Sequence, residues 1–138
     1  MPEFFPEHTP DDVDEFTQGY LACAEWLAHS ARDQEGTGEF DDADRATLRG
    51  FTRDAIAMAK RDCKAFQREN ANLLQQYQES TGRNMSSAGH DFWLTRNRHG
   101  AGFWDRGDAP CLRELTDASH AYGTVDCEMY RNRLHLTG

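Results

Sequence analysis

The sequence predicts an α+β fold that is mostly helical, with two long N-terminal helices, a short middle segment and one C-terminal helix. A small antiparallel sheet or hairpin closes it at the C-terminus. Two observations support this fold class: apolar residues recur at helical spacing up to residue 77, and two strand-like runs lie near the end of the chain. At 138 residues, with 3 Trp, 4 Tyr and 8 Phe, the chain can bury a core as one domain, 1–138, in which residues 1–10 are a flexible lead.

The first helix is predicted to start at Thr9–Asp12. Proline suits the first turn of a helix, and acidic side chains there face the positive end of the helix dipole. The amphipathic pattern then continues to about residue 31, with apolar positions at Val13, Phe16, Tyr20, Ala24 and Leu27. A polar loop over Gln34–Gly38 is expected to end this part.

The second helical region is predicted to begin at a cap formed by Asp41, Asp42 or Asp44. It is either one long helix or two helices broken near Arg68–Asn72. Its inward stripe consists of Leu48, Phe51, Ala55, Ala59, Cys63, Phe66, Asn70, Leu73 and Tyr77. We expect this stripe to face that of the first helix and Gly82 to end the region in a left-handed conformation.

The segment from Ser86 to Asp105 is compatible with either a helix or a pair of strands. Ser86 or Ser87 can cap a short helix that runs through Leu94. Alternatively, Asp91–Thr95 is a strand that turns and returns through Phe103–Asp105. Five residues are too few for periodicity to decide between a helix and a strand.

The C-terminal region predicts a helix followed by a hairpin. Residues 110–122 have helical spacing, and Gly123 is suited to stop the helix. A polar turn at Arg131–Arg133 then lies between two strand-like runs, Val125–Tyr130 and Leu134–Leu136. The helix is expected to direct inward Leu112, Leu115, either Ala118 or Ser119, and Tyr122.

The net charge of −9 is unevenly distributed. Residues 1–44 contain thirteen acidic side chains and one arginine, whereas residues 45–83 contain eight basic and four acidic ones. Such an acidic region repels nucleic-acid phosphates and membrane surfaces, and it either attracts a basic partner or pairs with the basic central helix. No apolar run approaches the roughly 20 residues that span a bilayer, and no signal-peptide pattern is present, so we expect a soluble, unexported protein.

The four cysteines are predicted to be reduced. They are Cys23, Cys63, Cys111 and Cys127, and no two of them form a Cys-x-x-Cys pair. The alternative is a metal site assembled in space from Cys111, Cys127 and histidines, but the spacing typical of metal ligands is missing. We therefore predict no cofactor.

Residues 90–108 concentrate aromatic, charged, imidazole and glycine side chains more densely than any other stretch. Imidazole has a pKa near neutrality and carboxylates are hard ligands, so acid–base chemistry or a divalent metal is one hypothesis. The spacing matches no hydrolase motif. The catalytic candidates under this hypothesis are His90, Asp91, His99 and Asp105.

The same segment also mixes arginines with aromatic rings, a combination that stacks bases or clamps phosphates. Six basic against seven acidic side chains after residue 83 argue against a broad nucleic-acid groove. A protein or small-ligand contact surface fits better, and the candidates for it are Trp93, Arg96, Arg98, His99, Trp104 and Arg106. The structural alternative is that the glycines only turn the chain, both tryptophans fill the core, and the carboxylates pair with the arginines.

Residues 88–107 have the sequence AGHDFWLTRNRHGAGFWDRG. Together with Asp62–Phe66, Glu69–Leu74 and Tyr122–Asp126, they resemble a family of small bacteriophage and prophage proteins, with Arg98 where the usual pattern has glycine. The resemblance covers most of the chain from about residue 15. It implies a phage origin and a location in the host bacterial cytoplasm, and it implies no activity.

Two functional hypotheses follow. The first is a phage accessory binding protein, an inhibitor of a host defence or nucleic-acid-binding protein, that presents acidic side chains to a basic host surface as a phosphate mimic. The acidic candidates are Asp11, Asp12, Asp14 and Glu15. A homodimer stays open as an alternative partner. The second hypothesis is a small metal-dependent hydrolase or nuclease centred on residues 90–105.

Overall fold

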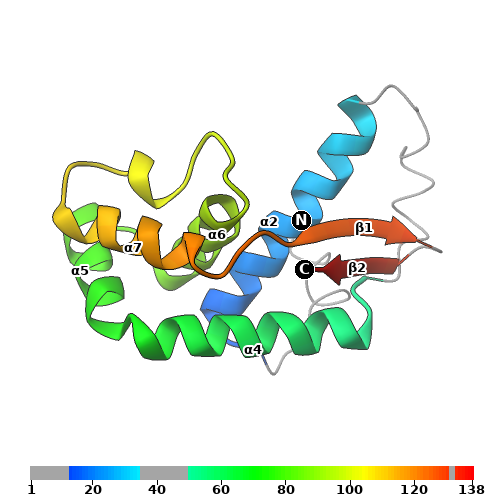
Figure 1. The fold of residues 1–138 in the computed structure, drawn as a ribbon, viewed down its shortest axis with the longest axis horizontal. Helices are drawn as coiled ribbons and strands as arrows, with labels where there is room; N and C mark the ends of the chain where they lie inside the picture. The colour runs from blue at the N-terminus through cyan, green and yellow to red at the C-terminus, as the bar shows by residue number, and fades with distance from the viewer. Residues whose placement is uncertain (1–12, 35–49, 131–132) are drawn as a thin grey trace.

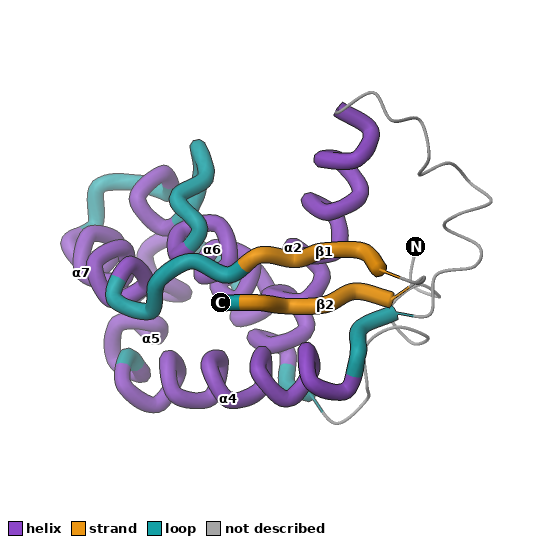
Figure 2. The backbone as a smooth tube through the Cα atoms, turned by 45° about the vertical axis from the view of Figure 1, so that its right-hand side comes forward, coloured by secondary structure: helices purple, strands orange, loops and turns teal. Residues whose placement is uncertain are grey.

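The computed structural model describes residues 13–34, 50–130 and 133–138, with main chain only for 29–34 (Figure 1). The mostly helical α+β fold is confirmed, and the hairpin runs alongside α4 in both views (Figures 1 and 2). No helix among the described residues is long and apolar enough to cross a membrane. The elements are α2 (Glu15–Gln34), α4 (Arg53–Glu69), α5 (Ala71–Thr81), α6 (Met85–Arg96), η1 (Phe103–Asp105), α7 (Pro110–His120), β1 (Asp126–Tyr130) and β2 (Arg133–Thr137).

Helix α2 begins at Glu15, and residues 13 and 14 before it are not helical. The backbone N–H of Thr17 donates to Oδ1 of Asp14 at 2.8 Å, so Asp14 caps the first turn. The predicted start at Thr9–Asp12, the flexible lead and the loop after residue 34 lie outside the described residues. Val13 precedes the helix and is nevertheless buried.

The second helical region consists of two helices, which confirms one of the two predicted alternatives. Asn70 separates α4 from α5, and its backbone N–H donates to the carbonyl of Phe66. Thr52 caps α4, while the predicted caps at Asp41, Asp42 and Asp44 lie outside the described residues. Phe51 was predicted within the helical stripe, which is wrong: it precedes the helix and forms a parallel bridge with Leu134. Gly82 ends α5 at φ +74°, as expected.

The segment with two alternatives is a helix, α6. Its cap is Asn84, whose Oδ1 accepts from the backbone N–H of Ser87 at 2.8 Å, so the predicted caps at Ser86 and Ser87 are wrong. The strand alternative is wrong as well, because Phe103–Asp105 forms a 3₁₀ turn. Asparagine and serine cap helices equally well, and the cap is set by where the backbone leaves the helix.

Helix α6 ends in a Schellman motif. The backbone N–H of His99 donates to the carbonyl of Leu94, and that of Arg98 donates to the carbonyl of Thr95, both at 3.0 Å. Arg98 is left-handed at φ +58° and, among the described residues, is the only non-glycine residue with a positive φ. A side chain at this position costs free energy that glycine would avoid.

We therefore expect Arg98→Gly to raise the free energy of unfolding by about 1 kcal/mol. Arg98→Ala removes the same exposed side chain but keeps the left-handed Cβ, so its stability should stay within about 0.5 kcal/mol of the wild type. Urea denaturation of the three proteins measures both values. Equal effects of glycine and alanine would contradict this account of the turn.

Helices α2 and α6 make the most extensive contact between elements. They approach so closely that a Cβ on Gly89 would collide with the carbonyl oxygen of Phe16, and one on Gly19 would collide with that of Ser86. Each helix therefore supplies a glycine at the point where the other backbone passes. This close crossing places α6 at the centre of the fold.

The core is rich in aromatic rings that come from α2, α4, α5, α6 and η1. Phe66 of α4 stacks on Phe92 of α6 with ring centroids 4.1 Å apart, and Phe16 and Tyr20 of α2 pack against the same Phe92 ring. Leu134 of β2 is fully buried in this cluster. These contacts pack α2 and α4 on α6, and Leu134 joins the hairpin to the same core.

The C-terminal elements confirm the prediction closely. Helix α7 begins at Pro110, buries Leu112, Leu115 and Ser119, and is followed by Gly123 at φ +75°. Strands β1 and β2 pair antiparallel, with Cys127 opposite Leu136 and Met129 opposite Leu134. Tyr122 lies beyond the end of the helix.

Candidate functional site

Residues 90–108 form the second half of α6, a turn, η1 and the loop that leads to α7. The two arms contact one another, because the backbone N–H of Phe103 donates to Oγ1 of Thr95 at 3.0 Å. Phe103 is fully buried and Trp93 is 3% exposed, whereas Trp104 is 50% exposed. The segment is therefore core along most of its length and surface at Trp104.

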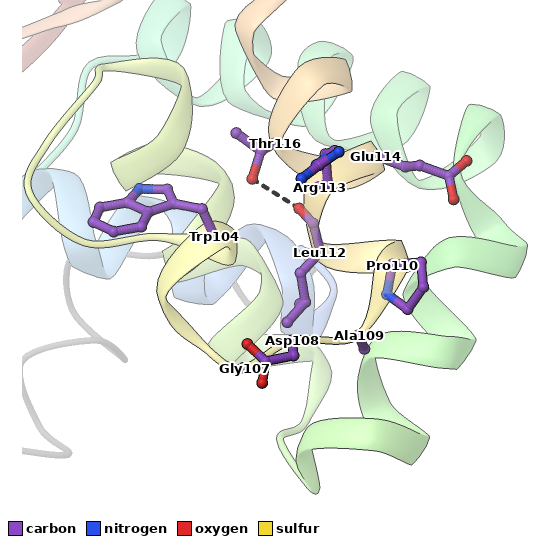
Figure 3. Close-up of a pocket in the computed structure, with 9 residues that line it drawn as sticks. All are labelled: Trp104, Gly107, Asp108, Ala109, Pro110, Leu112, Arg113, Glu114 and Thr116. Atoms are coloured by element: carbon purple, nitrogen blue, oxygen red, sulfur yellow. Dashed lines mark hydrogen bonds between the residues drawn. The ribbon is translucent and has the colours of Figure 1, made fainter.

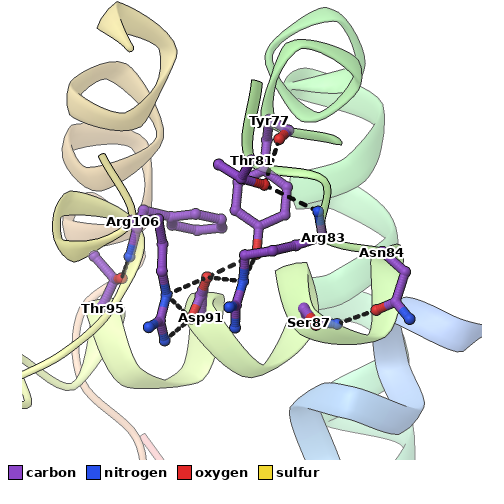
Figure 4. Close-up of polar contacts among 9 residues, drawn as sticks. Tyr77, Thr81, Arg83, Asn84, Ser87, Asp91, Thr95 and Arg106 are labelled. Atoms are coloured by element: carbon purple, nitrogen blue, oxygen red, sulfur yellow. Dashed lines mark hydrogen bonds and ion pairs between the residues drawn. The ribbon is translucent and has the colours of Figure 1, made fainter. Parts of the chain in front are cut away.

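Asp91 of α6 is a fully buried carboxylate whose partners come from α5, from the loop between α5 and α6 and from the chain after η1 (Figure 4). Arg106 donates from Nη2 to Oδ1 at 2.7 Å and from Nε to both oxygens at 3.1 Å. The Tyr77 hydroxyl donates to Oδ2 at 2.8 Å, and Nε of Arg83 lies 3.8 Å from the same oxygen. Both carboxylate oxygens are thus occupied, so Asp91 is positioned to hold the fold together and not to accept a substrate proton.

The pKa values around Asp91 follow from burial and from its charge. Burial raises the pKa of the Tyr77 hydroxyl, and the Asp91 carboxylate raises it further. The hydrogen bond to Asp91 is the largest cause that raises the pKa of Arg106. Burial lowers the pKa of His90, an effect that the charges of Arg106 and Arg83 reinforce and that of Asp91 opposes. The neutral form of the His90 imidazole is therefore favoured at neutral pH.

Arg96, the last residue of α6, belongs to a second buried network, and its side chain is 3% exposed. Its Nη1 donates to the Tyr20 hydroxyl and to Oδ2 of Asp62, both at 2.9 Å. Its Nε donates to the carbonyl of Gly123 at 2.8 Å, and its Nη2 donates to that of Tyr122 at 2.9 Å. Each nitrogen of the guanidinium thus donates inside the protein, and the buried side chain is not available to a phosphate or a partner.

The four catalytic candidates do not assemble into one centre. Asp91 is enclosed and His90 is half-buried, whereas His99 and Asp105 are exposed. Among the described residues, no group of three or more His, Cys, Asp and Glu side chains could hold a metal ion. The geometry therefore gives no support to a shared metal or acid–base centre.

The candidates for partner contact divide into an interior and a surface set. Trp93 and Arg96 are buried, and Arg106 is engaged by Asp91. Asp11 and Asp12 lie outside the described residues, and Asp14 is used as the cap of α2. The candidates left on the surface are Arg98, His99, Trp104 and Glu15.

The four cysteines are free thiols, as predicted. Cys23, Cys63 and Cys111 are buried, and Cys127 is partly buried. Burial raises the pKa of the Cys127 thiol to about 12, and it also raises the pKa of the Cys23 and Cys63 thiols. High thiol pKa values leave little thiolate, so these three side chains are poor nucleophiles.

Sequence reasoning did not predict a surface groove of about 620 Å³ between η1 and α7 (Figure 3). Trp104 forms one side of it and α7 forms the other. We call it the Trp104 groove; its main lining residues are Trp104, Gly107, Asp108, Pro110, Arg113 and Glu114. The aromatic and glycine content of residues 90–108 indicated this region, but nothing local distinguishes the outward Trp104 from the inward Trp93.

Glu25 is a second feature that the sequence analysis missed. It lies on the inner side of α2 and is 1% exposed, and burial raises the pKa of its carboxyl to about 8. Its spacing of four residues from the buried Leu21 is the signal that places it on the inward face. The carboxyl is thus predominantly protonated at neutral pH.

Comparison with known proteins adds no relative. No protein-family model, curated protein or solved structure matches this chain. The phage resemblance of residues 88–107 therefore stays a prediction, and the functional assignment depends on the geometry alone.

Proposed function

We propose that this chain is a phage-encoded accessory binding protein that acts in the host bacterial cytoplasm by engaging a host protein with a basic surface. The observation that carries the proposal is the use of Asp91, Arg96 and Arg106 inside the fold. Because one candidate for catalysis, Asp91, and two candidates for ligand or partner contact, Arg96 and Arg106, hold the scaffold together, the surface is left to provide the function.

The charge distribution supports a basic partner. Thirteen of the 24 acidic side chains lie in residues 1–44, and the chain carries a net charge of −9. A concentrated negative field speeds association with a positive surface and disfavours direct binding to DNA or RNA. The same field resembles that of nucleic-acid phosphates, so a host defence protein or other nucleic-acid-binding protein is the class of target that we propose.

The test is affinity capture from host lysate with a charge-neutralised variant and a matched control. The variant carries Asp11→Asn, Asp12→Asn and Glu15→Gln, and it leaves the cap of α2 intact. The control neutralises three exposed acids in other parts of the chain, Glu79→Gln, Asp126→Asn and Glu128→Gln. We expect the wild type and the control to retain a nucleic-acid-binding protein that is released above roughly 0.5 M salt and displaced by DNA.

The variant should lose that protein. Retention by the variant, or capture that resists both salt and DNA, would overturn the electrostatic proposal. Circular dichroism of all three proteins checks that neutralisation leaves the fold unchanged.

A further inference from the structure

We propose that the Trp104 groove binds an arginine-containing segment of the basic partner, with the guanidinium over the Trp104 indole. The inference rests on the proposed function and adds the place of contact. The groove has the volume to hold a side chain and its flanking backbone, about 620 Å³, and its two sides come from η1 and α7 (Figure 3).

The indole of Trp104 is presented by a fixed backbone. Phe103, which precedes Trp104, is fully buried, and its N–H donates to Oγ1 of Thr95. Arg106, two residues after Trp104, donates to the carboxylate of Asp91. The N–H of Asp105 donates to the carbonyl of Gly102 at 3.0 Å. A half-exposed tryptophan on such a rigid support loses little conformational entropy on binding, which is a property of interface anchors.

Acidic side chains outnumber basic ones in the lining of the groove. Asp108 and Glu114 line it, and the exposed side chains of Asp105 and Asp117 lie on the same two elements. Arg113 is the one basic side chain among the lining residues. An aromatic face in a groove with a net negative lining attracts a cation, because the ring quadrupole and the acidic charges act in the same direction.

Apolar surface completes the site. Pro110, Ala109 and Leu112 provide its non-polar lining on the α7 side. The methylene groups of an arginine can pack on such a surface while the guanidinium reaches the indole and a carboxylate. The net negative lining and the charge of the whole chain favour a basic protein segment over an acidic peptide or a nucleic acid.

The experiment measures binding of a short fluorescein-labelled arginine–glycine peptide by fluorescence anisotropy at low salt. We expect Trp104→Ala to weaken binding about tenfold, because a cation–π contact contributes up to about 2 kcal/mol and 1.4 kcal/mol corresponds to a factor of ten. The matched control is Trp26→Ala, since Trp26 is 65% exposed on α2 and does not line the groove. Its affinity should stay within about twofold of the wild type.

A second variant, Asp108→Asn with Glu114→Gln, tests the charges separately. This variant should bind the arginine peptide more weakly, and its binding should depend less on salt, while the indole stays in place. Circular dichroism confirms that each variant is folded, and a glutamate–glycine peptide serves as the probe of opposite charge.

The outcomes separate the two proposals. Equal affinity of wild type, Trp104→Ala and Trp26→Ala for the arginine peptide would overturn the groove and leave the basic-partner proposal standing. Preference of the wild type for the glutamate peptide, or no binding of the arginine peptide to the wild type, would also overturn the groove, whereas the basic-partner proposal is decided by the capture experiment.

Discussion

Arg96→Ala is expected to lower the free energy of unfolding by about 3–5 kcal/mol, the largest effect of any single substitution that we predict. The substitution removes five hydrogen-bond donors from a side chain that is 3% exposed. It leaves the carboxylate of Asp62 without its buried partner and the carbonyls of Tyr122 and Gly123 without donors. Leaving such groups unsatisfied costs more than the original pair contributed.

The matched control is Arg61→Ala. Arg61 pairs with the same Asp62, from Nε to Oδ1 at 3.1 Å, but its side chain is 70% exposed. Water replaces an exposed pair at little cost, so the loss should be at most about 1 kcal/mol. Urea denaturation followed by circular dichroism gives both values, and Arg96→Lys supplies a measurable variant if the alanine variant does not fold.

A loss below about 1 kcal/mol for Arg96→Ala would contradict this interpretation. It would mean that water enters the cavity and solvates Asp62, and that the network contributes little to the free energy of unfolding.

Gly89→Ala is expected to lower the free energy of unfolding by about 3 kcal/mol. Alanine favours an isolated helix by about 1 kcal/mol over glycine, but here its Cβ would collide with the carbonyl oxygen of Phe16. Backbone cannot move aside as a flexible side chain does, so α2 and α6 must separate and the stacked aromatic core loosens. The steric cost therefore outweighs the gain in helix propensity.

Gly100→Ala is the control for this prediction. No atom lies within 4 Å of a Cβ at Gly100, so its stability should change by less than about 0.5 kcal/mol. Thermal and urea unfolding of the two variants compare the positions directly. If the two alanines have equal effects, the helix crossing tolerates a side chain and the close approach of α2 and α6 is not required.

The amphipathic helices and the hairpin could be predicted because each has an exposed and a buried face. Helix α7 buries Leu112, Leu115 and Ser119 at three- and four-residue steps, which is the pattern that periodicity detects. Helix α6 could not be predicted in this way. Residues 91–96 are buried on every side, and a helix that is enclosed all round shows no alternation of apolar and polar residues.

The role of residues 90–108 could not be predicted for a different reason. Its unusual composition is visible in the sequence, but whether a carboxylate catalyses or holds the fold depends on partners that are distant along the chain. Tyr77 and Arg83 meet Asp91 only in the folded structure, as Tyr20 and Asp62 meet Arg96. The structural alternative in the sequence analysis described Asp91 and Trp93 correctly, but Trp104 does not fill the core.

The contacts of Arg96 also bear on how this molecule unfolds. One guanidinium joins α2, α4 and the chain that follows α7, through partners 76, 34 and 27 positions away in sequence. Detaching any one of these segments would strand a cation or a carboxylate in a non-polar interior, so partial opening costs nearly as much as complete opening. The described part of the chain should therefore behave as a single cooperative unit and give proteases few intermediates to attack.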